Sequence, residues 1–144
     1  MGAKKALICA FFAALSPPAA AQTATAGNTI DCTFSPKHSI QVKSGQVTET
    51  KDTSRDLVIT FTSFNPEKST ASLVGNAGSA DLFFTVDGGY LFLAQMWGSA
   101  IKTFTSMPLP TEGSSVPAVH SRHVWFPGAS AGIISQWSGP CRLR

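Results

Sequence analysis

Residues 81–97, DLFFTVDGGYLFLAQMW, are the stretch that decides the fold class. Two runs of aliphatic, aromatic and β-branched residues flank Asp87, Gly88 and Gly89. Asp-Gly and Gly-Gly pairs at such a place favour the two-residue turns of β-hairpins, whose backbone needs positive φ. The stretch therefore predicts two antiparallel strands joined by a tight turn.

The two faces of this hairpin follow from the alternation of side chains along a strand. A turn at Asp87-Gly88 and a turn at Gly88-Gly89 differ by two residues in register, so every side chain keeps its face. Because both faces hold large apolar groups, we expect the hairpin to lie centrally in a sandwich or to have its outer face covered. One face is predicted to carry Leu82, Phe84, Val86, Leu91 and Leu93, and the other Phe83, Thr85, Tyr90, Phe92 and Ala94.

Strand-like patterns continue on both sides of the hairpin, without helical periodicity. Two segments rich in Pro and Gly, 108–117 and 127–132, are predicted as surface loops. The pattern predicts an all-β fold class, an antiparallel meander of about eight strands that closes as a small barrel or a sandwich. The predicted strands outside the hairpin cover residues 30–34, 40–43, 46–51, 57–64, 71–74, 101–107, 119–126 and 133–137.

The chain opens with the three parts of a secretory signal peptide. Lys4 and Lys5 precede an apolar run at residues 6–15, and small residues follow a Ser-Pro-Pro break. That run is too short for the roughly 20 residues that span a bilayer. A lipoprotein signal would need a cysteine at the cleavage point, whereas Cys9 lies inside the run. We predict that residues 1–21 are removed and that the chain is periplasmic or secreted.

Removal of the signal leaves a predicted flexible lead-in at 22–29 and a single β domain at 30–144. It also leaves an even pair of cysteines, Cys32 and Cys141. In an oxidising compartment such a pair is normally a disulfide. A disulfide between them would close a loop of about 110 residues, and in the chain-entropy model this stabilises the folded state by roughly 4 to 5 kcal/mol. The alternative, a redox or metal pair of free thiols, lacks the C-x-x-C spacing.

The composition limits the function classes. The 144 residues are 43% hydrophobic and 13% charged, which excludes a largely disordered chain. The 12 Gly, the 9 Pro and the absence of heptads exclude a coiled coil. No run concentrates Lys and Arg, so nucleic acid is not an expected partner. The net charge of +3 includes Lys4 and Lys5, and without them charge indicates no class of partner.

His120, Arg122 and His123 are the clustered polar residues of most chemical interest. On a strand, His120 and Arg122 point one way and His123 the other, and His-x-x-His spacing does not give two metal ligands on one face. We therefore predict no metal site and no cofactor. The expected role is that of hydrogen-bonded residues at a strand end, with Arg122 as an alternative anchor for an anionic ligand or the C-terminal carboxylate.

Signals for catalysis are weak. No serine lies in a G-x-S-x-G turn, and no acidic residue is placed by sequence near a histidine. Several of the eight carboxylates flank predicted turns or strand ends, and we expect the carboxylates to favour solubility. We predict that the protein is not an enzyme. The alternative is a hydrolase using His120 or His123 with a carboxylate from a distant strand.

A binding role is the leading prediction. Aromatic residues on strands usually pack in a core, but an eight-stranded barrel can also hold one small ligand in its mouth. A small apolar ligand would be lined by Phe84, Leu91 and Leu93 from one hairpin face, with Arg122 as a polar anchor. A protein partner would instead meet the loop at 108–117, with Glu112 and Gly113 as contacts, because rigid scaffolds often carry function on loops. An enzyme-inhibitor-like or a structural envelope role is the alternative.

Two segments near the C-terminus, AVHSRH at 118–123 and ISQWSGPC at 134–141, resemble the ending of a group of short exported bacterial proteins of unknown function. Trp137 stands where that group has a tyrosine. The resemblance implies no activity, but it implies that the tail with Cys141 belongs to a shared framework. A weaker likeness connects the predicted fold to periplasmic lysozyme inhibitors, which are small disulfide-bearing β-barrels. Their Gly-x-x-Tyr recognition signature is not evident here, so that comparison concerns the fold alone.

Overall fold

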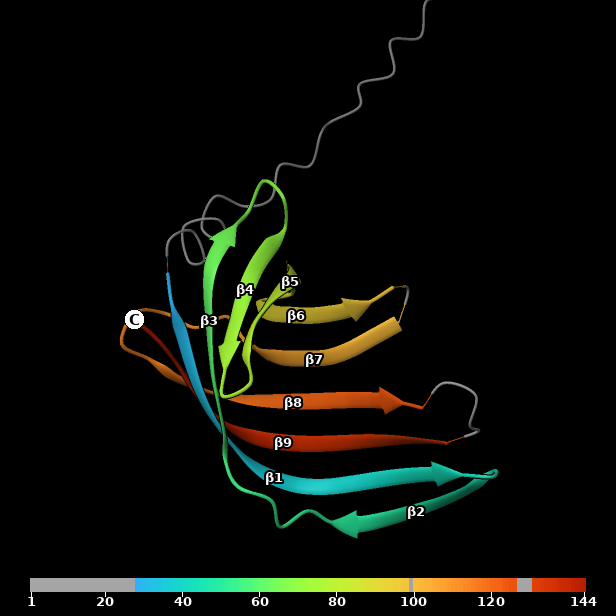
Figure 1. Cartoon of the computed structure of the whole chain (residues 1–144). Coiled ribbons are helices and arrows are strands. Elements are labelled where there is room, and N and C mark those ends of the chain that lie inside the picture. The colour runs from blue at the N-terminus through green and yellow to red at the C-terminus, as the bar shows by residue number, and fades with distance from the viewer. Residues whose placement is uncertain (1–27, 99, 127–130) are drawn as a thin grey trace, which may run out of the picture.

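The computed structural model describes residues 28–98, 100–126 and 131–144, and the regular structure in these ranges is β-strand throughout (Figure 1). The predicted signal peptide and most of the predicted lead-in lie outside the described residues. In the described part of the chain, no helix is long and apolar enough to cross a membrane. The strands are β1 (Ile30–Lys43), β2 (Gln46–Lys51), β3 (Leu57–Asn65), β4 (Thr70–Gly75), β5 (Gly78–Asp87), β6 (Tyr90–Trp97), β7 (Ala100–Pro108), β8 (Ser115–Trp125) and β9 (Ala131–Leu143).

The strands close into an antiparallel barrel. Their order is β2-β1-β3-β4-β5-β6-β7-β8-β9, and β1 also pairs with β9. Eight strands therefore form the closed barrel, while β2 pairs with the last residues of β1. The predicted all-β meander is confirmed, and of the two closures left open by the sequence the barrel is the one that forms.

β1 is shared between two parts of the sheet. Its first residues, from Ile30 to Phe34, pair with β3, and its last, from His38 to Lys43, pair with β2. A register shift against β9 between Pro36 and His38 marks the change of neighbour. The prediction of two separate strands here was wrong, because a proline without an N–H is tolerated at a bulge. In Figure 1, the antiparallel strands β3 and β4 are drawn roughly upright, and β6 to β9 are drawn across them.

Covalent and polar contacts hold the seam between β1 and β9. Cys32 and Cys141 lie opposite each other in register and form the predicted disulfide, with a Cα–Cα distance of 4.1 Å. Beyond it, the Arg144 N–H donates to the Thr29 carbonyl at 2.8 Å. The first and last barrel strands are therefore joined both by a covalent bond and by backbone pairing.

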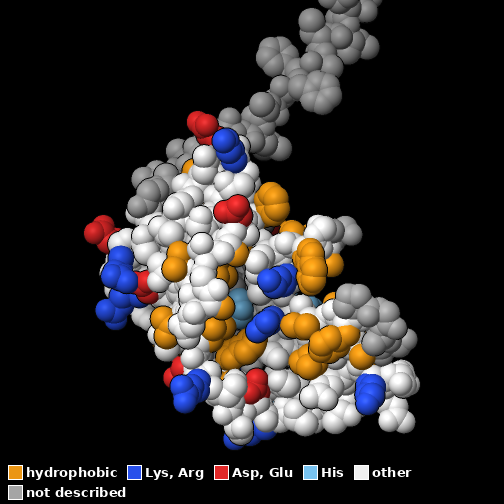
Figure 2. All heavy atoms as spheres, in the orientation of Figure 1, with side chains coloured by type: hydrophobic (Ala, Val, Ile, Leu, Met, Phe, Trp, Pro, Cys, Tyr) orange, Lys and Arg blue, Asp and Glu red, His pale blue; other side chains and the backbone are white. Residues whose placement is uncertain are grey.

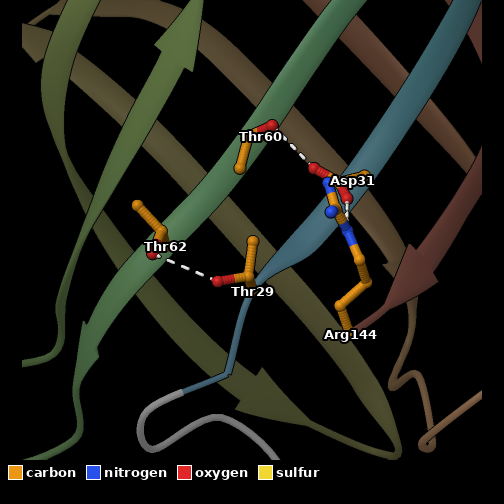
Figure 3. A network of polar contacts seen from close by, with 5 residues as sticks. All are labelled: Thr29, Asp31, Thr60, Thr62 and Arg144. Carbon is orange, nitrogen blue, oxygen red and sulfur yellow. Dashed lines mark hydrogen bonds and ion pairs between the residues drawn. The ribbon is translucent and has the colours of Figure 1, made fainter.

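A network of side chains connects this seam to β3 (Figure 3). The Asp31 carboxylate accepts a hydrogen bond from the Arg144 Nε and another, at 2.7 Å, from the Thr60 hydroxyl. The hydrogen bond from Arg144, with a further contribution from Thr60, holds the pKa of Asp31 below its ordinary value. The hydroxyls of Thr29 and Thr62 lie 3.3 Å apart beside it. The start of β1 and the residue after β9 are therefore both linked to β3 by side chains.

The central hairpin forms as predicted. Gly88 and Gly89 have φ values of 56° and 83°, and Asp87 pairs with Tyr90, so the two glycines occupy the turn. Of the two predicted faces, the one that carries Leu82, Phe84, Val86, Leu91 and Leu93 points into the barrel, where Leu91 and Leu93 are almost fully buried. The core comprises Ile30, Cys32, Phe34, Ile59, Phe61, Phe64, Ala71, Leu82, Phe84, Leu91, Leu93, Met107, Ala118, Trp137, Cys141 and Leu143.

The outer face of the hairpin differs from the prediction. Phe83 and Tyr90 are 57% and 50% exposed, so this face is neither central in a sandwich nor covered. The rings of Tyr90, Phe92 and Phe104 stack in a row, with centroids 6.4 and 6.2 Å apart. The rings cover part of one another's apolar area, which reduces the cost of leaving them on the surface.

Prolines enter the strands where the sequence predicted loop. β8 already begins at Ser115 and includes Pro117, which lies opposite Pro140 of β9. Neither proline can donate a hydrogen bond, so the pair fits a position where the two strands exchange none. The loop predicted at 108–117 is therefore reduced to 109–114, and β9 continues past the end predicted at Trp137.

Candidate functional site

A pocket of about 300 Å³ lies between the turn joining β4 to β5 and the strands β6 to β9. Figure 1 shows that turn in front of the sheet, and Figure 2 shows basic and hydrophobic side chains side by side in the middle of this face, with a histidine visible between them. One wall of the pocket is apolar and the opposite wall is polar. The lining residues are Leu57, Ile59, Leu73, Gly75, Asn76, Ala77, Gly78, Ser79, Ala80, Gln95, Lys102, Thr103, His120, Arg122 and Trp137.

The polar wall follows from the register of β7, β8 and β9. His120 lies opposite Thr105 and Trp137, and Arg122 lies opposite Thr103. His120 and Arg122 both line the pocket, as the alternation along the strand predicted. Lys102 joins them although it neighbours Thr103 in sequence, because a register shift between β6 and β7 at this point re-aims a side chain.

His120 is buried at the base of the pocket, with only 2% of its surface exposed. Its Nδ1 lies 2.7 Å from the Thr105 hydroxyl, and its ring packs against Phe34 and Trp137 with centroid distances of 5.4 and 5.8 Å. Burial, together with the charge of Arg122, lowers the pKa of His120 to about 4. The ring is therefore neutral at neutral pH, and the predicted strand-end residue is instead part of the interior.

His123, the second histidine of the predicted cluster, faces outward. His123 Nε2 lies 3.2 Å from the Ser121 hydroxyl, on the side of β8 opposite to His120. Within the described ranges, neither imidazole forms a hydrogen bond or ion pair with a carboxylate. The same residues contain no group of three or more His, Cys, Asp or Glu side chains that could hold a metal ion. The chemistry that this site offers is recognition by charge, hydrogen bonding and apolar contact.

Trp137 carries an unusual polar atom. The residue is 91% buried, since its exposed fraction is 9%, and it lines the pocket. Its indole Nε1 is a buried donor without a hydrogen-bond partner among the described residues. Leaving such a donor unpaired costs about 1 to 3 kcal/mol, so each case in a folded protein needs an explanation.

The predicted site residues fall in different places. Phe84, Leu91 and Leu93 pack in the core and line neither pocket, and Phe84 makes an edge contact with Phe64 at a centroid distance of 5.2 Å. Arg122 does line the pocket. Sequence reasoning missed the apolar wall from β3 and β4, because the hairpin face was expected to supply it. The missed wall residues are Leu57, Ile59 and Leu73.

A second hollow, of about 620 Å³, lies on the outer surface where β7 and β8 diverge. The two strands pair only from Thr103 to Ser106, and the hollow is lined beyond that point by Pro108 and Pro117, among others. Both prolines remove a backbone donor, which makes addition of a further strand unfavourable. Glu112 and Gly113 are exposed and line neither hollow, so their predicted role as partner contacts stays a prediction.

No protein-family model matches the chain, and neither a curated protein nor a solved structure matches it. The likeness of the C-terminal segments to a group of exported proteins therefore stays a prediction. The pocket is therefore the feature from which a function can be inferred.

Proposed function

We propose that this protein is an exported, non-catalytic module that binds a small, largely apolar ligand in the pocket between the β4–β5 turn and the β6–β9 wall. The observation that carries the proposal is the division of this pocket into two unlike walls. Leu57, Ile59 and Leu73 supply apolar surface, and Gln95 and Arg122 stand among the polar groups facing it. Concave sites with mostly apolar walls and a few convergent polar groups are typical of small-molecule binding.

Export is supported by two independent features. The first is the sequence pattern of residues 1–21, with its basic start, short apolar run and small-residue end. The second is the Cys32–Cys141 disulfide, because such bonds persist mainly in oxidising compartments. Both features agree with a periplasmic or secreted protein.

A titration with the neutral fluorescent probe N-phenyl-1-naphthylamine tests the ligand pocket. The disulfide-bonded mature protein is expected to bind one probe molecule saturably, with enhanced emission. Leu57→Ser is expected to weaken binding about five- to tenfold, because it removes most of one apolar side chain from the wall. Val58→Ser is the matched control, since Val58 is adjacent in sequence, 48% exposed and outside the pocket lining.

Two results would overturn the proposal. One is the absence of saturable probe binding to the folded protein. The other is equal binding by the wild type and Leu57→Ser, which would place the probe elsewhere on the surface. Circular dichroism of each variant ensures that the comparison is made between folded proteins.

A further inference from the structure

We propose that the ligand is an amphipathic organic anion, whose acidic group is bound by Arg122 and Lys102 while its apolar body lies on the opposite wall. This inference rests on the proposed function and specifies the chemical class of the ligand. A carboxylate or sulfonate group has the required charge and hydrogen-bond acceptors.

The charge of the pocket is one-sided. Lys102 and Arg122 lie on the neighbouring strands β7 and β8, where Arg122 is opposite Thr103, the residue after Lys102. Both basic residues line the pocket, and its lining contains no acidic residue. Neither one forms an ion pair within the described ranges. Two like charges held close together without a counter-charge repel each other, so binding of an anion between them is favourable.

Trp137 belongs to the same pocket but does not present its N–H to a ligand. The residue lines the pocket, whereas its Nε1–H is buried without a partner and has almost no accessible surface. The contact that Trp137 offers a ligand is therefore apolar contact with the ring, beside the two basic side chains.

The neutral state of His120 agrees with the same arrangement. The ring lies beside Trp137 and is opposite it in the register of β8 and β9. The positive charge of Arg122 is one reason that this ring does not take up a proton at neutral pH. The charge available to a ligand at this wall therefore comes from Lys102 and Arg122.

The apolar wall indicates the chemical nature of the rest of the ligand. Leu57, Ile59 and Leu73 come from β3 and β4, on the other side of the pocket from the basic pair. A small inorganic anion would leave this wall in contact with water, whereas an apolar body of ten to fifteen carbon atoms, on the order of the pocket volume, would cover it.

The test compares two probes that share one chromophore. 1-Anilinonaphthalene-8-sulfonate carries a sulfonate that the neutral N-phenyl-1-naphthylamine lacks. Arg122→Gln and Lys102→Gln are each expected to weaken binding of the sulfonate about tenfold and to leave binding of the neutral probe within about twofold. Lys68→Gln is the control, because it removes the same charge from an exposed residue in the turn between β3 and β4.

The failures of the two proposals are distinguishable. If the neutral probe binds but Arg122→Gln and Lys102→Gln do not change the ratio of the affinities, the anion inference is wrong and the ligand pocket stands. If neither probe binds the folded protein saturably, both proposals are wrong. Equal loss of sulfonate binding in Lys68→Gln would also overturn the inference, because only the net charge would then matter.

Discussion

Thr105 and His120 meet in the interior of the barrel, where the threonine hydroxyl lies 2.7 Å from the imidazole Nδ1. The two residues face each other across β7 and β8, and both are almost fully buried. The pair occupies positions that an aliphatic core would otherwise fill. Each polar group satisfies the other, which removes the main cost of burying them.

We expect the protein to lose stability on mild acidification. The unfolded chain takes up a proton on His120 near its ordinary pKa of 6.5, whereas the folded protein resists this until about pH 4. The contribution is therefore fully present above pH 6.5 and is lost as the pH falls toward 4, by about 3 kcal/mol in all. Urea unfolding at pH 7.0, 5.5 and 4.5 measures it.

Two variants identify the residue responsible. His120→Asn keeps a polar group near the position of Nδ1 but does not titrate, so its stability should change little over this pH range. His123→Asn should retain the full dependence. The depressed pKa of Asp31 acts separately, because its contribution is present above the ordinary value of 3.8 and is lost only at lower pH. An unchanged dependence in His120→Asn would contradict the assignment.

Reduction of the Cys32–Cys141 disulfide should destabilise the barrel strongly. The bond joins residues 109 positions apart, and a loop of that length corresponds to roughly 4 to 5 kcal/mol in the chain-entropy account. Urea unfolding of the oxidised and reduced protein measures the difference. A double Cys32→Ala, Cys141→Ala variant should resemble the reduced protein and should not respond to reductant, and a response would point to an effect elsewhere.

Gly139 should be intolerant of a side chain. A Cβ at this position would collide with the carbonyl oxygen of Thr33, which belongs to the backbone of β1 and cannot move aside. Gly139→Ala should therefore cost about 2 kcal/mol or more in the free energy of unfolding. Gly75→Ala is the matched control, because the nearest atom to its Cβ would lie at an ordinary contact distance of 3.7 Å. Equal losses would show that chain flexibility, not contact, is responsible.

Ala77→Trp should close the candidate pocket without harming the fold. Ala77 is exposed in the turn between β4 and β5 and contributes to the pocket lining. A large ring there should lower the affinity for N-phenyl-1-naphthylamine at least about fivefold, because it competes with the probe for space. Glu67→Trp places the same ring in the exposed turn between β3 and β4, outside the pocket. Unimpaired binding by Ala77→Trp would contradict the location of the site.

Local patterns predicted much of the fold. The glycine turn and the alternation along residues 81–97 were sufficient for the hairpin and its two faces, because both are properties of neighbouring residues. The Cys32–Cys141 bond followed from counting, since only two cysteines remain after the predicted signal. The alternation of His120 and Arg122 also held, although the burial of His120 was not foreseen.

The site depended on information that local patterns do not carry. Leu57 and Leu73 meet Lys102 and Arg122 only because the barrel closes, and this closure brings together strands far apart in sequence. The predicted strand boundaries near Pro36 and Pro117 were wrong for a related reason. Whether a missing N–H matters depends on which neighbour the residue faces, and that is decided by tertiary pairing.

The seam disulfide has a consequence for cleavage of the chain. Every peptide bond between Cys32 and Cys141 belongs to one covalent ring, and this ring includes the loop at 109–114, whose residues 111–113 are exposed. A protease that cuts the loop once opens the ring but releases no fragment, and the strands on both sides of the cut remain linked. A single nick in this loop therefore leaves one covalently connected molecule.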